Sequence, residues 1–105
     1  VYPLTLLFSA VDDKDYTDMI HTILDRIHFR HVVVTQVGGY RKVPAEDLAE
    51  IFRRYGCSSA EACEDVTEAF RKALSEKGNE GMLFCVGSLY LVGEIKTALL
   101  KGEIR

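Results

Sequence analysis

The stretch that decides the fold lies near the end of the chain and reads Gly81-Met82-Leu83-Phe84-Cys85-Val86-Gly87-Ser88-Leu89-Tyr90-Leu91-Val92-Gly93-Glu94. Its first half is a short apolar run without charge, which is typical of a strand buried on both faces, and its second half predicts a helix. At the junction, Gly87 lets a ligand approach the backbone closely, and Ser88 places a hydroxyl beside the unpaired N–H groups of a first helical turn. Such a corner can hold a carboxylate or a phosphate.

The rest of the chain alternates apolar runs with amphipathic segments. Strands are expected at 4–10 and 31–37, with a short edge strand within 58–63. Apolar residues spaced three and four apart predict helices over 16–27, 44–55, 66–74 and from Ser88 to about Gly102, the third begun by a capping-box-like pair, Asp65 and Glu68. This alternation predicts an α/β fold with a mostly parallel sheet and helices on both faces. No linker or repeat divides the chain, so residues 1–105 are expected to form a single domain.

Composition narrows the class of protein. The 105 residues are 48% hydrophobic and carry a formal net charge of −3, which suits one globular domain and gives no basic stripe for nucleic acid. No run approaches the roughly 18 to 20 apolar residues of a membrane span, and no leader opens the chain, so a cytoplasmic protein is expected. The three cysteines lack a Cys-x-x-Cys pair, which favours a reducing compartment, and Cys85 is predicted to be a small core residue.

Three loops are candidates for a binding site, because ligands of open α/β sheets bind at the carboxyl ends of the strands. They span 9–15, 36–41 and 87–88. Together they would place Lys14, Arg41 and Ser88 around one crevice suited to a carboxylate. The alternative is that each residue has only a local role, with Lys14 and Arg41 solvated and Ser88 a helix cap. Ser88 lacks the Glu or Gln three residues on that would complete a capping box, since Leu91 stands there.

Other kinds of site find little support in the sequence. His28 and His31 have metal-like spacing but flank a helix-to-strand turn, and His21 lies away from the apolar stripe of its helix, so no metal site is expected. The chain contains neither a G-x-x-x-x-G-K-[ST] phosphate loop nor a G-x-G-x-x-G fingerprint, and no hydrolase triad is indicated.

The segment from Gly87 to Glu94, preceded by its apolar strand, resembles the C-terminal signature of folylpolyglutamate synthase and bifunctional dihydrofolate synthase, members of the Mur ligase superfamily. Asp13-Lys14-Asp15-Tyr16, Val34-Thr35 followed by Arg41, and the helix from Pro44 to Glu50 occur in the order of that family. The resemblance runs over essentially the whole chain. It implies a Rossmann-like three-layer α/β/α sandwich, truncated at its N-terminal edge.

The resemblance also implies an activity for a longer parent enzyme. Enzymes of this family use ATP, with Mg²⁺, to phosphorylate the carboxylate of a pterin substrate, and the amine of glutamate attacks the acyl phosphate. ATP is held mainly by a central domain that is expected to lie outside this chain, so no cofactor is expected in the fragment. By similarity Lys14 would contact the carboxylate of the incoming glutamate, Ser88 would donate to it, and Arg41 would line the same cleft.

Two departures from the family limit what this chain is expected to do. The segment like Asp-Gly-Ala-His-Asn that opens the family's domain is absent, because the chain begins downstream of it at Val1, so no catalytic residue is assigned here and the chain alone is expected to be inactive. Ser9 stands where the family commonly has glycine, in a supporting set formed with Asp13, Asp15 and Gly87. An apolar sheet edge left open at the truncation would favour self-association.

Two alternatives remain open at this point. One is a non-catalytic module that senses an amino acid or another carboxylate with the same corner. The other is a receiver-like signalling domain, suggested by Asp12-Asp13 after the first strand, although Gln36-Val37-Gly38 and Gly87-Ser88 stand where such a domain needs an acceptor aspartate and a lysine.

Overall fold

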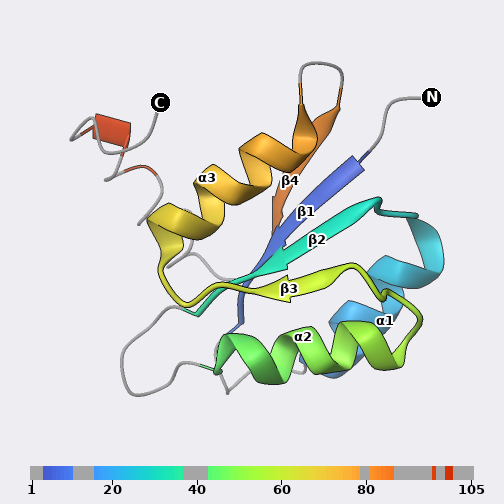
Figure 1. Cartoon of the computed structure of the whole chain (residues 1–105). Helices are drawn as coiled ribbons and strands as arrows, with labels where there is room; N and C mark the ends of the chain where they lie inside the picture. The colour runs from blue at the N-terminus through green and yellow to red at the C-terminus, as the bar shows by residue number, and fades with distance from the viewer. Residues whose placement is uncertain are drawn as a thin grey trace.

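The computed structural model describes residues 4–10, 16–36, 43–78, 81–86, 96 and 99–100. The elements in these ranges are β1 (Leu4–Phe8), α1 (Tyr16–Arg26), β2 (His31–Val34), α2 (Ala45–Arg54), β3 (Ala60–Ala62), α3 (Val66–Lys77) and β4 (Met82–Val86) (Figure 1). Strands and helices alternate throughout, so the predicted α/β class is confirmed.

The four strands form one parallel sheet in the order β3-β2-β1-β4. After β3 the chain crosses to the far side of β1, as in the first half of a doubly wound Rossmann sheet with order 3-2-1-4-5-6. The receiver-like alternative requires the flavodoxin-like order 2-1-3-4-5, in which β3 lies next to β1. Here β3 pairs with β2 instead, which argues against that alternative.

The sheet is the middle of three layers (Figure 1). Alternate residues of a strand point to opposite faces, so Leu6 and Phe8 pack against α1 and α2, whereas Leu7 packs against α3. The ring of Phe8 meets that of Phe52 edge to face, with centroids 5.4 Å apart. The larger core lies on the α1 and α2 side, and a smaller one, containing Val33 and three residues of α3, lies on the other side.

The ends of the helices follow from local chemistry. In α3 the carboxylate of Asp65 accepts a hydrogen bond from the backbone N–H of Thr67 at 3.3 Å, so the predicted N-cap is confirmed. The prediction of a complete capping box is wrong, because the side chain of Glu68 pairs with Arg71 instead of accepting from the backbone N–H of Asp65. The C-terminal turn of α2 is closed by Gly56, whose φ of +99° suits glycine.

The largest correction concerns β4, which was expected to be buried on both faces. Met82 is 49% exposed and Phe84 38%, and Cys85 is exposed instead of lying in the core. The reason is position in the sheet: within the described residues β4 pairs only with β1, so one of its edges has no neighbouring strand. An apolar run indicates that a strand is stabilised by burial, but it does not indicate how many neighbouring strands it pairs with.

Other boundaries differ by a few residues. β1 ends at Phe8, not Ala10, and β2 at Val34, not Val37, while the edge strand expected within 58–63 is confirmed as β3. The predicted helix from Ser88 to Gly102 falls largely outside the described residues. Among the helices that are described, none has the length and apolar character needed to cross a bilayer.

Candidate functional site

The carboxyl ends of the strands form the edge at which the sequence predicts a binding site. At this edge the backbone N–H of Ser9, just after β1, donates to the carbonyl of Val86 at the end of β4, with an N–O distance of 3.2 Å. On the other side of β1, the N–H of Thr35 donates to the carbonyl of Phe8 at 2.9 Å. The ends of β4, β1 and β2 therefore lie side by side, and the three candidate loops begin from adjacent positions.

The junction between β1 and β4 is also where the strand order reverses. Chain order increases from β1 through β2 to β3 in one direction, and β4 lies on the opposite side of β1. In open α/β sheets such a reversal leaves a crevice outside the carboxyl ends of the strands. The geometry of the described strands thus favours a site between the loops that follow Ser9 and Val86.

Two contacts hold the ends of the segment that contains Arg41. The side-chain oxygen of Gln36 accepts a hydrogen bond from the N–H of Ala45 at 3.1 Å, in the first turn of α2. Val43 donates its N–H to the carbonyl of Ala10 at 3.4 Å. Pro44, at the N-cap, has no side-chain group that could accept from the first N–H groups of the helix. Gln36 accepts from one of them instead.

Most of the predicted site residues cannot be placed. Lys14, Arg41 and Ser88, together with Asp13, Asp15 and Gly87 of the supporting set, lie outside the described residues, and their roles stay predictions. Ser9 is described: it is fully buried, directly beside the end of β4. It occupies the position at which the resemblance led us to expect glycine.

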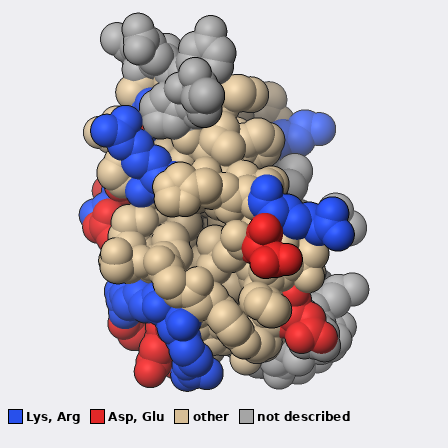
Figure 2. Space-filling view, turned by 90° about the vertical axis from the view of Figure 1, so that its right-hand side faces the viewer, with Lys and Arg blue, Asp and Glu red and all other residues tan. Residues whose placement is uncertain are grey.

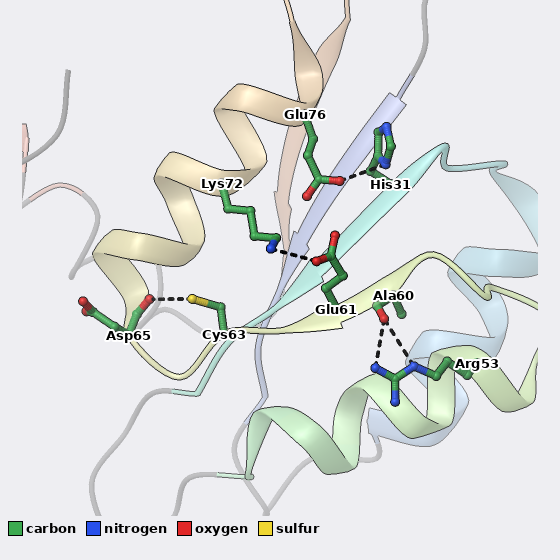
Figure 3. Close-up of polar contacts among 8 residues, drawn as sticks. All are labelled: His31, Arg53, Ala60, Glu61, Cys63, Asp65, Lys72 and Glu76. Carbon is green, nitrogen blue, oxygen red and sulfur yellow. Dashed lines mark hydrogen bonds and ion pairs between the residues drawn. The ribbon is translucent and has the colours of Figure 1, made fainter.

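A second group of polar side chains lies on the α3 face of β2 and β3 (Figure 3). His31 Nδ1 is 2.8 Å from Glu76 Oε2, and Lys72 Nζ is 2.7 Å from Glu61 Oε2. Glu61 is the register partner of Val33, whose side chain packs under α3, so the carboxylate of Glu61 continues that face beyond the apolar core. The network ties the last turns of α3 to two strands.

The two carboxylates of this network have pKa values shifted in opposite directions. Burial raises the pKa of Glu76, and the negative charge of Glu61 raises it further, against the opposing effect of His31 and Lys72. The hydrogen bond from Lys72 lowers the pKa of Glu61. Nearby, burial raises the pKa of the Cys63 thiol, which donates to the backbone carbonyl of Asp65 at 3.7 Å.

This network could not be found from the sequence, because no local spacing connects His31 with Glu76. Its carboxylates face the ammonium group of Lys72 and the imidazole of His31, which is the arrangement of a structural polar network. Among the described residues, no group of three or more His, Cys, Asp or Glu side chains could hold a metal ion. The family resemblance implies that Mg²⁺ is bound by a domain outside this chain, and no chemical step is assigned to a metal here.

No family model matches the chain, and no curated protein matches it significantly. Solved structures do match. Folylpolyglutamate synthase from Mycobacterium tuberculosis, complexed with ADP, has 26% sequence identity and a TM-score of 0.74, with 90% of this chain and 23% of that one aligned. The chain resembles one domain of the folylpolyglutamate synthases.

Two further solved structures also match the chain. The folylpolyglutamate synthase of Thermotoga maritima aligns with 99% of this chain and 23% of its own at 27% identity and a TM-score of 0.71. The bifunctional folylpolyglutamate synthase/dihydrofolate synthase of Yersinia pestis, complexed with AMPPNP and a Mn ion, aligns with 93% of this chain at a TM-score of 0.76, and at 18% identity it supports the fold alone. The family resemblance seen in the sequence is confirmed, and so is a Rossmann-like domain of the Mur ligase type. The chain spans less than a quarter of the length of each of these enzymes.

Proposed function

We propose that residues 1–105 form the C-terminal, amino-acid-binding domain of a longer ATP-dependent ligase that adds glutamate to folate or dihydropteroate through an acyl phosphate. The observation that carries the proposal is the contact between Ser9 and Val86, which brings the starts of two candidate loops together at the reversal of strand order. The similarity to two folylpolyglutamate synthases at 26% and 27% identity supports the reaction class.

In this proposal the domain positions one substrate. Lys14, the hydroxyl of Ser88 and the backbone N–H groups beside it hold the carboxylate of the incoming glutamate, and Arg41 lines the same crevice. Attack of an amine on an acyl phosphate depends on alignment and on neutralisation of charge, and fixed cations and helix N–H groups supply both. ATP and Mg²⁺ are assigned to the N-terminal part of the same polypeptide, which is the partner of this domain.

The test is kinetic and uses the full-length enzyme that carries this domain. Ser88→Ala and Lys14→Ala should each raise KM for glutamate about tenfold, since a charge-assisted hydrogen bond is lost, and should change KM for ATP less than about twofold. Lys77→Ala is the matched control, because the hydrogen bond that Lys77 makes within the described residues goes to the neighbouring carbonyl of Gly78 at the end of α3. Equal effects on both substrates would contradict a glutamate site at this corner.

The isolated chain should have no ligase activity, because the acyl phosphate must form on another domain. Incubation of the 105 residues with ATP, Mg²⁺, glutamate and a folate should release no ADP above background, measured with a coupled assay. Measurable addition of glutamate by the isolated chain would overturn the placement of catalysis between domains.

The exposed side of β4 suggests where the rest of the polypeptide docks. Met82 and Phe84 are register partners of Leu4 and Leu6, so they share the face that α1 and α2 cover farther along the sheet. An additional strand beyond β4, connected to β1 through a helix, would cross the sheet in the same direction as the connection from β1 to β2. A right-handed crossover in that direction places the connecting helix on this same face. Without such a segment, the surface is open to a second copy of the chain.

A further inference from the structure

A pocket of about 370 Å³ lies at the opposite edge of the sheet, where the strands begin. Its walls are the end of α1, the turn that leads into β2, and the turn from α2 to β3. Figure 2 views the molecule from this side, and most of the surface there carries neither a positive nor a negative side chain. The pocket is therefore separate from the carboxyl edge at Ser9 and Val86, and nothing in the proposed ligase role uses it.

Several polar side chains of the pocket suit an anion. His28 and Arg30 line it together with the hydroxyl-bearing residues Tyr55, Ser58 and Ser59, and no carboxylate lies among the lining residues although the chain has a net charge of −3. Within the described part of the chain, no hydrogen bond or ion pair engages the imidazole of His28 or the guanidinium of Arg30. The planar fork of an arginine matches a carboxylate or a phosphate, and an imidazole or a hydroxyl can donate beside it.

The walls are held before any ligand arrives. On one side the N–H of Arg30 donates to the carbonyl of Leu4 at 2.8 Å, which leaves only its side chain free to move. On the other side the N–H of Cys57 donates to the carbonyl of Phe52 at 2.9 Å, and that of Ala60 to the carbonyl of Cys57 at 3.3 Å. A site whose backbone is already fixed loses less conformational entropy on binding.

The pocket also offers aromatic surface. Phe29 is only 5% exposed and closes part of the wall, whereas Tyr55 is 41% exposed. The ring of Tyr55 stacks on His21, with centroids 4.8 Å apart and an interplanar angle of 24°, which fixes its orientation. Apolar walls with a few convergent polar groups are the usual lining of a small-molecule site.

We propose that this pocket binds a small organic anion, whose carboxylate or phosphate group is held by Arg30, His28 and the two serine hydroxyls while its planar apolar part lies against Tyr55. Because the pocket is at the amino edge of the sheet, its occupant cannot contact groups at the carboxyl edge. It is a second site of the domain, suited to a regulatory ligand.

The test is titration of the 105-residue chain, followed by NMR of backbone amides, with four probes. Benzoate and phenyl phosphate should shift the amide resonances of residues 28–30 and 56–59. The probe that binds more tightly shows whether the pocket prefers a carboxylate or a phosphate. Inorganic phosphate should bind more weakly because it lacks the apolar part, and benzyl alcohol should cause no saturable shift because it lacks the charge. Saturable binding of benzyl alcohol comparable to benzoate, or anion shifts confined to residues near Ser9 and Val86, would overturn the proposal.

Variants separate recognition from folding. Arg30→Ala should weaken the better probe at least about tenfold, and Arg30→Lys should fall between it and the unaltered chain. Arg71→Ala is the matched control, because Arg71 pairs with Glu68 on α3 across the sheet and its loss should leave binding unchanged. Ser58→Ala, at an exposed position, gives a second reading if Arg30→Ala fails to fold. Unchanged affinity in both pocket variants would refute the site, whatever the outcome of the ligase test.

Discussion

At the scale of single residues, Glu76 is the side chain whose environment opposes its charge most clearly. Its side chain is 18% exposed, one carboxylate oxygen lies 2.8 Å from His31, and the other is buried without a hydrogen-bond partner among the described residues. An ionised carboxylate loses hydration on burial, and this one faces the charge of Glu61 as well. The free energy of unfolding should therefore respond to the protonation of Glu76.

The sign follows from the direction of the shift. Because folding raises the pKa of Glu76 above its ordinary value of 4.5, the stability that it contributes is present below that value and is lost as the pH rises through the higher folded pKa. Glu61 acts oppositely: its pKa is lowered, so its contribution is present above the ordinary value and is lost as the pH falls through the folded pKa.

Glu76→Gln removes the charge while keeping the size of the side chain and an oxygen that can accept from His31. We expect the variant to lose the decline in stability above pH 4.5 and to be more stable than the unaltered chain at pH 7 by about 1 kcal/mol. Urea unfolding at pH 4.5 and pH 7 measures both effects. Glu68→Gln, an exposed change on the same helix, is the control, and a variant of Glu76 that is less stable at pH 7 would show that its pairing with His31 dominates.

At the scale of elements, α3 depends on the N-cap residue that precedes it. Asp65 is the side chain that accepts from the N–H of Thr67, and α3 in turn supplies Val66, Ala69 and Ala73 to the smaller core. Loss of the cap frays the turn that carries the first of these contacts.

Asp65→Ala should lower the free energy of unfolding by about 1 kcal/mol, within the usual range of about 0.5–2 kcal/mol for an N-cap. Asp65→Ser should restore most of the loss, because a hydroxyl can accept the same hydrogen bond. Chemical denaturation measures the change, with Glu64→Ala as the neighbouring control, since Glu64 accepts from Thr35 through its backbone carbonyl, which the substitution keeps. A loss in Glu64→Ala as large as in Asp65→Ala would argue against the cap as the cause.

The two helix starts show how far local sequence carries. Asp65 and Thr67 are neighbours, so a local rule finds the cap of α3. The start of α2 uses Gln36, nine positions before Ala45, and only the tertiary structure brings these residues together. The sequence therefore predicted the existence of both helices but the capping of only one.

At the scale of the whole molecule, the open side of β4 is the feature with the largest expected consequence. Met82 and Phe84 are both exposed, and the ring of Phe84 meets that of the buried Phe29 edge to face at 6.1 Å, so the surface is continuous with the core. Exposed apolar surface next to an unpaired strand edge favours association.

The isolated chain should self-associate, with an apparent mass in sedimentation velocity that rises between about 10 and 300 µM, a range in which weak apolar contacts form. A double change, Met82→Lys with Phe84→Lys, should leave a monomer, because two desolvated ammonium groups oppose burial of the surface. Ser75→Lys, at an exposed position of α3, controls for added positive charge. A monomeric unaltered chain over the whole range would contradict this use of the β4 surface.

By itself the sequence determined the kinds of element, their order along the chain, most helix starts and the resemblance to a ligase family, because these depend on periodicity, caps and short motifs. Only the tertiary structure decided that β4 pairs with β1 and ends the described sheet. That placement exposes Phe84 and Cys85, which were predicted from the sequence to be buried, and it brings Val86 beside Ser9. It likewise brought His31 to Glu76 and formed the pocket at Arg30 and Ser58. The physical reason is that the pattern of apolar residues depends on how much of a segment is buried. Which strands lie next to it is decided by long-range crossover connections, which local spacing does not encode.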